Sequence, residues 1–189
     1  MRRLYLIRHG EPASVWGDAD TDPGLDPDGR AQAEAARDQL LSLPVGQRPT
    51  RVVSSPLRRC RETAQPTAAA LGVAVEIDPA VGEIPTPAGL AAAERPAWLR
   101  EAFRGRWADV RGDLDYKAWR GDVAAALCAH GGAAVFSHYV AINAVMSHLQ
   151  GDERVLVFQP DHASISVLET DGAVLALIEK GAEASTSVL

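Results

Sequence analysis

The chain has 189 residues, of which 47% are apolar and 23% charged, a balance typical of a soluble globular protein with a sizeable core. The formal net charge of −6 disfavours nucleic acid as the main partner, because phosphate backbones bind basic surfaces. No stretch has the length of a membrane span or a signal-peptide core, so we expect a cytoplasmic protein with no membrane partner.

An apolar run of strand length, Leu4–Ile7, begins the chain and stops at Arg8, His9 and Gly10. Ligands bind at the carboxyl ends of strands in open α/β sheets, so this junction is a candidate site. Gly10 allows a tight turn or a close approach of the backbone.

The next segments predict a loop over residues 13–24 and a helix that starts at Asp26-Pro27 and stops before Pro44. A second strand is predicted at 51–54, with a helix starting at once from Ser55-Pro56. We expect Pro66 to interrupt that helix.

A short strand is predicted at 73–77, and residues 79–96 then carry too many prolines for one continuous helix. Thr86-Pro87 and Pro96 are candidate starts of short helices. Several aromatic side chains follow, so residues 84–120 form either a lid or pocket wall, or an aromatic satellite core under a long connection.

The carboxyl half predicts helices at 115–130 and 140–149 on either side of a strand at 133–137. Further strands are expected at 155–158, 164–169 and 173–179, with an Asp171-Gly172 hairpin and a frayed tail at 181–189.

Alternating strands and helices favour an α/β fold, namely a three-layer α/β/α sandwich with a mostly parallel central sheet and an antiparallel edge. No repeat or second domain is evident, so we expect a single domain over residues 1–189. Cys60 and Cys128 have no metal-ligand spacing, and we expect neither a metal nor a cofactor.

Three strand ends carry groups suited to phosphate: Arg8-His9, Ser54-Ser55 with Arg59 one turn later, and His138. Parallel strands place their carboxyl ends on one edge of the sheet, so these groups can converge. Two of the three lie at helix N-termini, which favour anions. The pattern predicts a metal-free phosphoryl pocket, because the arginine fork donates two parallel bonds to phosphate oxygens.

The motifs together resemble the histidine phosphatase superfamily, which includes the phosphoglycerate mutases. Leu6-Ile7-Arg8-His9-Gly10-Glu11 is similar to its signature, and residues 22–33 to its first helix entry. Residues 54–64 are similar to its second arginine motif, and Val135-Phe136-Ser137-His138 to its second histidine motif. The resemblance therefore implies a phosphoglycerate mutase-like fold.

The resemblance implies that His9 is the nucleophile that accepts the phosphoryl group. Arg8 and Arg59 would bind its equatorial oxygens, with Arg58 facing solvent. His138 would bind phosphoryl oxygen as an imidazolium. Glu83 occupies the place of the family's acid, which protonates the leaving oxygen and later activates water; a solvated loop glutamate is the alternative.

Departures from the family pattern fall at two places. The segment after Glu83 is rich in proline, and Asp161-His162-Ala163-Ser164 replaces an asparagine often found there. His162 is then either a residue of the pocket rim or a strand-end histidine with a structural role. Ser14 is a weaker candidate for contact with phosphate.

We expect a metal-independent phosphomonoester hydrolase that acts through a phosphohistidine intermediate on a small phosphorylated substrate, with a phosphoprotein left open. The alternatives are a phosphoglycerate mutase-type phosphoryl transfer, which requires exclusion of water, and a non-catalytic module that binds phosphorylated ligands. Neither the physiological substrate nor the oligomeric state can be derived from the sequence.

Overall fold

The computed structural model of the chain describes residues 1–14 and 22–185, so parts of the expected loop at 13–24 and tail at 181–189 lie outside it. None of the helices within these ranges is long and apolar enough to span a bilayer. The strands are β1 (Arg2–Arg8), β2 (Arg51–Ser54), β3 (Val75–Ile77), β4 (Ala133–Ser137), β5 (Ile165–Thr170) and β6 (Leu175–Glu179). The α-helices are α1 (Pro27–Ser42), α2 (Arg58–Leu71), α3 (Arg95–Arg104), α4 (Tyr116–Cys128) and α5 (Tyr139–Gln150).

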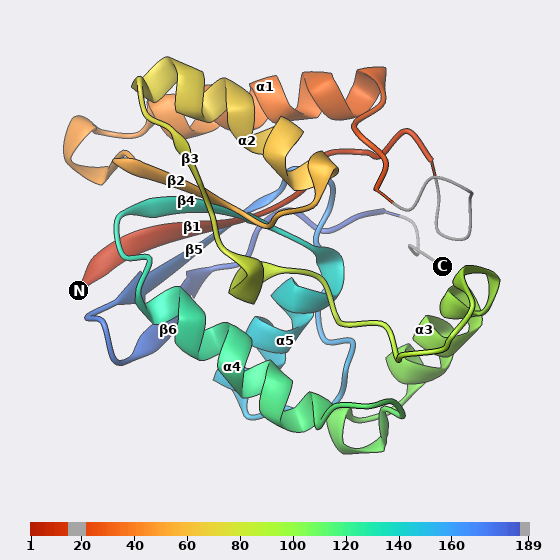
Figure 1. Ribbon diagram of the computed structural model, residues 1–189. Helices are drawn as coiled ribbons and strands as arrows, with labels where there is room; N and C mark the ends of the chain where they lie inside the picture. Colours follow the sequence, from red (N-terminus) through yellow and green to blue (C-terminus); the bar gives the residue numbers. More distant parts are fainter. Residues whose placement is uncertain (15–21, 186–189) are drawn as a thin grey trace.

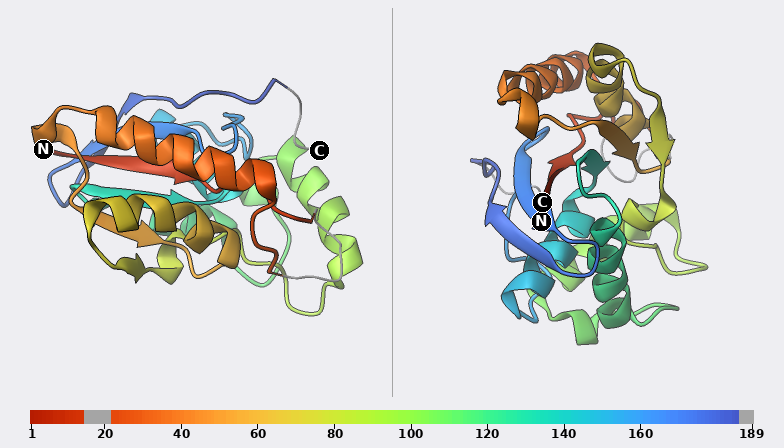
Figure 2. Two further views of the ribbon diagram at one scale, coloured as in Figure 1. Left: turned by 90° about the horizontal axis from the view of Figure 1, so that it is seen from above. Right: turned by 90° about the vertical axis from the view of Figure 1, so that its left-hand side faces the viewer.

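The strands form one sheet in the order β3-β2-β4-β1-β5-β6. The pairs β2–β3, β2–β4 and β1–β4 are parallel, whereas β5 pairs antiparallel with both β1 and β6. Helices α1 and α2 cover one face, and α4 and α5 cover the other (Figures 1 and 2). The predicted three-layer sandwich with an antiparallel edge is therefore confirmed.

Alternate residues of β1 pack into different cores. Leu4 and Leu6 lie in the cluster under α4 and α5, whereas Tyr5 and Ile7 lie in the cluster under α1 and α2. All four are at most 2% exposed. Burial on both faces explains why this strand is an unbroken apolar run rather than an alternating one.

A third apolar cluster fills the space beneath the excursion between Glu83 and α4. Its members are Ile84, Leu99, Trp107, Tyr116, Tyr139, Val140, Ala144 and Val155. This cluster is an aromatic satellite core, and a role of residues 84–120 as a lid or pocket wall stays a prediction. Pro96 does lie in the first turn of α3. Thr86-Pro87 opens no helix, because the chain there is irregular up to a turn at Ala88 and Gly89. Figure 1 shows α3 beyond the carboxyl ends of the parallel strands.

Two other expectations are wrong. Pro66 lies inside α2 without interrupting it, because the helix packs a buried face that includes Cys60 and Ala64 against its neighbours. Residues 155–158 form no strand. The side chain of Asn143 explains this: its Oδ1 accepts hydrogen bonds from the backbone N–H groups of Val157 and Phe158, both at 3.0 Å, so these donors join no ladder.

The start of α1 packs directly on the turn after β1. Asp26 caps the helix by accepting a hydrogen bond from Gly29 N at 2.6 Å. A Cβ at Gly29 would lie 2.1 Å from Glu11 O, and one at Gly10 would lie 2.5 Å from Gly29 O. Both contacts are with backbone atoms, so only glycine allows this approach.

Replacing Gly29 with alanine should therefore destabilise the fold by about 1–3 kcal/mol, since the backbone must move to accept the methyl group. Urea unfolding followed by circular dichroism measures the change. Gly46→Ala is the matched control, because a Cβ there meets nothing within 4 Å. A Gly29→Ala variant as stable as the control would contradict the close approach.

Candidate active site

Four of the predicted site residues meet at the carboxyl ends of the parallel strands. Arg8 ends β1 and His9 follows it, Arg59 lies in the first turn of α2 after β2, and His138 caps α5 after β4. Each is at most 5% exposed. The His9 and His138 ring centroids are 5.3 Å apart, and Arg59 Nη2 lies 3.2 Å from His138 Nδ1. Segments distant in sequence thus form one compact cationic cluster.

The ring of His9 has a defined proton position. Its Nδ1 lies 2.7 Å from Gly10 O, and a carbonyl oxygen can only accept, so Nδ1 carries the proton. Burial, with the charges of His138, Arg59 and Arg8, holds the His9 pKa well below its usual value. The imidazole is therefore neutral and presents a lone pair at Nε2, as a nucleophile requires.

A second layer of contacts holds the carbonyl that orients His9. Thr63 Oγ1 accepts a hydrogen bond from Gly10 N at 2.9 Å and donates one to Arg59 O at 2.7 Å. The backbone N–H of His9 donates to Ser137 O at 3.0 Å. His9 is thus tied to both α2 and the end of β4.

The guanidinium of Arg8 is held from several sides. Its Nη1 donates to Pro160 O at 2.9 Å, Nη2 lies 2.8 Å from His162 Nε2, and the group lies 5.0 Å from the centroid of the Tyr139 ring. Burial lowers the pKa of Arg8 to about 10, which still leaves the side chain charged at neutral pH. Arg8 is therefore a fixed positive charge beside His9.

His138 differs from the expected imidazolium. Arginine can only donate, so His138 Nδ1 accepts from Arg59 and the proton lies on Nε2, which is 2.7 Å from Ser55 Oγ. Burial, followed by the charges of Arg59, Arg95 and Arg8, keeps the His138 pKa well below its usual value. Here His138 is thus a neutral donor fixed between Arg59 and Ser55.

Glu83 enters the same cluster from the segment after β3. Ser137 Oγ donates to Val81 O at 2.8 Å and so attaches this segment to the end of β4. Glu83 Oε1 accepts from Ile84 N at 2.9 Å, and Oε2 is buried with no hydrogen-bond partner among the described residues. Burial raises the Glu83 pKa, although the charges of Arg95, Arg59 and Arg8 oppose the shift. These features suit a carboxyl group that exchanges a proton.

Sequence reasoning missed Arg95 and left His162 undecided. Arg95 starts α3, donates through Nε to Thr86 Oγ1 at 2.7 Å, and acts electrostatically on Glu83 and His138. His162 contacts Arg8, with its ring centroid 6.0 Å from that of His9. One signal in the sequence could have pointed to Arg95. It directly precedes Pro96, where a helix was expected to start, in a segment considered as a pocket wall.

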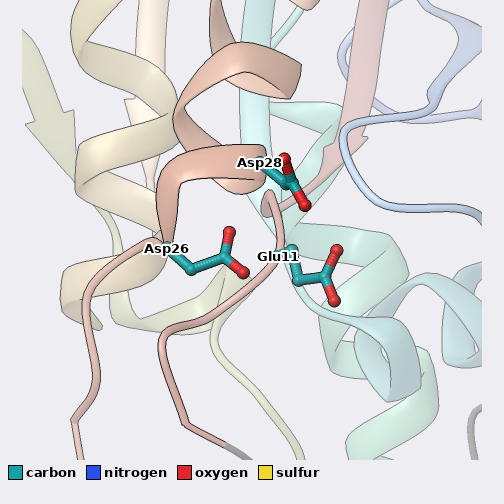
Figure 3. Close-up of side chains that lie close together, drawn as sticks. All are labelled: Glu11, Asp26 and Asp28. Carbon is teal, nitrogen blue, oxygen red and sulfur yellow. The ribbon is translucent and has the colours of Figure 1, made fainter.

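Three carboxylates gather at the loop after β1 and the start of α1 (Figure 3). The oxygens of Glu11, Asp26 and Asp28 lie within 4.8 Å of one another, close enough to share a cation. Asp26 already caps α1, and the helix N-terminus itself stabilises acidic groups, so we assign this cluster no ligand. Ser14 Oγ is buried and forms no hydrogen bond within the described residues.

Comparisons with known proteins identify the family and the fold of the chain. The model of the histidine phosphatase superfamily (branch 1) matches residues 4–181, whereas no curated protein matches significantly. A mycobacterial glucosyl-3-phosphoglycerate phosphatase superposes with a TM-score of 0.72 at 22% identity, over 97% of this chain and 100% of that one. A phosphoserine phosphatase from Entamoeba histolytica, in complex with 3-phosphoglyceric acid, gives 0.72 at 21% identity, over 96% and 98%. At these identities the likeness establishes a shared fold.

Adjacent arginines provide a direct test of the site. Arg59→Ala should weaken binding of vanadate by about 10- to 100-fold, because it removes a buried charged donor beside His138. Arg58→Ala should leave binding nearly unchanged, since the Arg58 side chain is 57% exposed and pairs with Glu62. Isothermal titration calorimetry measures both. Equal effects of the two substitutions would place the anion elsewhere.

Proposed function

The chain belongs to the histidine phosphatase superfamily (branch 1), and on that premise we propose that it hydrolyses phosphomonoesters through a phosphohistidine intermediate on His9. The observation that carries the proposal is the 2.7 Å contact between His9 Nδ1 and Gly10 O, which assigns the ring proton to Nδ1. The Gly10 carbonyl holds it there, and Nε2 is left as a neutral nucleophile in a cluster of positive charge. Phosphoryl transfer depends mainly on positioning and electrostatic stabilisation, which such a cluster supplies.

In the first step His9 Nε2 attacks phosphorus and the bond to the ester oxygen breaks. Arg8 and Arg59 bind the equatorial oxygens, and His138 donates a hydrogen bond from its Nε2–H to one of them in place of its bond to Ser55. These donors neutralise the charge that develops on the transferring group without a metal ion. The product is phosphohistidine and an alkoxide that needs a proton.

Glu83 supplies that proton. Burial favours its protonated form, which donates to the leaving oxygen, and the resulting carboxylate takes a proton from the water that attacks phosphohistidine. The water oxygen becomes part of inorganic phosphate, and both His9 and Glu83 return to their starting states. One carboxyl group thus serves as acid and then as base.

A small phosphorylated molecule is the substrate class we favour. The two similar solved structures are described as phosphatases of glucosyl-3-phosphoglycerate and phosphoserine, both of which are small phosphoesters. A mutase would instead move the phosphoryl group between positions of one substrate, and a binding module would retain phosphate without turnover. The acid candidate Glu83 beside the cluster supports turnover over simple binding. The 189-residue chain carries no long basic insertion to hold a diphosphate, which favours hydrolysis over a mutase.

Hydrolysis of p-nitrophenyl phosphate in the presence of a chelator tests the proposal. The wild-type protein should release inorganic phosphate, and His9→Ala should reduce release to the background rate because the nucleophile is lost. His148→Ala is a matched control on the exposed side of α5 and should retain full activity. Activity that survives His9→Ala, or that requires an added metal ion, would overturn the mechanism.

Arg95 should control the pH dependence of the first step. Of the charged groups that lower the Glu83 pKa, Arg95 has the largest effect. Replacing it in Arg95→Gln should therefore let that pKa rise further. Because the acid must be protonated to donate, the alkaline limb of kcat/KM should move to higher pH, and Glu83→Gln should remove that limb. Arg100→Gln, an exposed change on the same helix, should shift nothing. A shift to lower pH in Arg95→Gln would exclude Glu83 as the acid.

A further inference from the structure

His162 lies in the loop between α5 and β5, next to the proposed nucleophile. Its ring is partly buried, its centroid is 6.0 Å from that of His9 with the planes tilted by 39°, and its Nε2 is 2.8 Å from Arg8 Nη2. The resemblance to known phosphatases assigned no role to this residue. Its contacts show that it touches the phosphate-binding machinery rather than filling the end of a strand.

The proton position on His162 follows from its partner. Arginine has no acceptor, so His162 Nε2 must accept the hydrogen bond and the ring must carry its proton on Nδ1. Burial and the charge of Arg8 lower the His162 pKa to about 4, against the opposing effect of Asp161 and Asp26. The ring is thus neutral over the physiological range, and its bond to Arg8 persists there.

Arg8 is held at both terminal nitrogens by this single loop. Nη1 donates to Pro160 O and Nη2 donates to His162, while Nε is buried with no hydrogen-bond partner among the described residues. A buried donor without an acceptor is rare in folded proteins. An oxyanion placed against Nε and the remaining N–H groups would give this donor an acceptor. Because the loop holds both Nη atoms, it sets the direction in which the Arg8 guanidinium faces.

The loop is itself fixed to the fold and to His9. Asn143 holds its first part through Val157 N and Phe158 N. At its end, Ala163 adopts a left-handed conformation with φ of 54° and donates through its backbone N–H to His9 O at 3.3 Å. The same loop therefore positions both the arginine fork and the backbone of the nucleophile.

We propose that His162 is a positioning residue whose neutral ring accepts a hydrogen bond from Arg8 and aims its guanidinium at the phosphoryl oxygens. This inference rests on the proposed function, because it takes Arg8 as a ligand of the phosphoryl group. It assigns His162 no direct contact with that group. The role belongs to this chain's own sequence, in which Asp161-His162-Ala163-Ser164 replaces an asparagine often found there in the family.

Calorimetric titration with vanadate tests this on four variants and the wild type. His162→Ala should weaken binding about tenfold, as expected for loss of a hydrogen bond to a charged group. His162→Gln should recover most of the affinity, because its amide oxygen can accept from Arg8. In an Arg8→Ala background, adding His162→Ala should cause no further loss.

Three results would overturn the inference: unchanged binding in His162→Ala, no recovery in His162→Gln, or a further loss when His162→Ala is added to Arg8→Ala. The last would mean that His162 contacts the anion itself. Thermal unfolding of each variant separates these results from misfolding, and the partly exposed position favours folded variants. If the wild-type protein fails to bind vanadate, it is the proposed function that fails.

Discussion

The hydrogen bond from His9 Nδ1 to the carbonyl of Gly10 is the interaction on which the site depends. It decides which ring nitrogen keeps a lone pair, and so which atom attacks phosphorus in the proposed mechanism. Gly10 is held in turn by its N–H bond to Thr63 and by its close packing against Gly29. The start of α1 and the middle of α2, neither of which supplies the nucleophile, therefore determine its orientation.

Buried positive charge is the second constraint. Arg8 and Arg59 are both nearly inaccessible in a chain whose net charge is −6, and close burial of like charges is unfavourable. Carbonyl oxygens, the ring of Tyr139 and neutral histidines offset part of this cost. The same positive charges lower the pKa values of His9 and His138 and attract an anion. Buried charge that destabilises the fold thus favours binding of the proposed substrate.

Much of the architecture was predictable because local signals agree with the global fold. The apolar runs, the Asp26-Pro27 helix start and the strand ends that carry Arg8, Arg59 and His138 all follow from residue type and spacing. The errors have physical causes that spacing does not reveal. Asn143 accepts hydrogen bonds from the backbone donors of a strand expected at 155–158. Helix α2 continues past Pro66 because one of its faces is buried. His138, expected to be charged, accepts a hydrogen bond from Arg59. His162 lies in a loop and Arg95 at the start of α3, and tertiary contacts decide where both lie, so the sequence did not reveal their approach to the site.

The position of phosphorus on the trapped enzyme tests the central claim most directly. Wild-type protein mixed with a phosphomonoester, quenched rapidly in mild alkali and examined by peptide mass spectrometry and ³¹P NMR, should show one phosphohistidine, at His9, with phosphorus on Nε2. Phosphorus on Nδ1 would mean that the Gly10 carbonyl does not set the proton position, and phosphorus on another residue would mean that His9 is not the nucleophile.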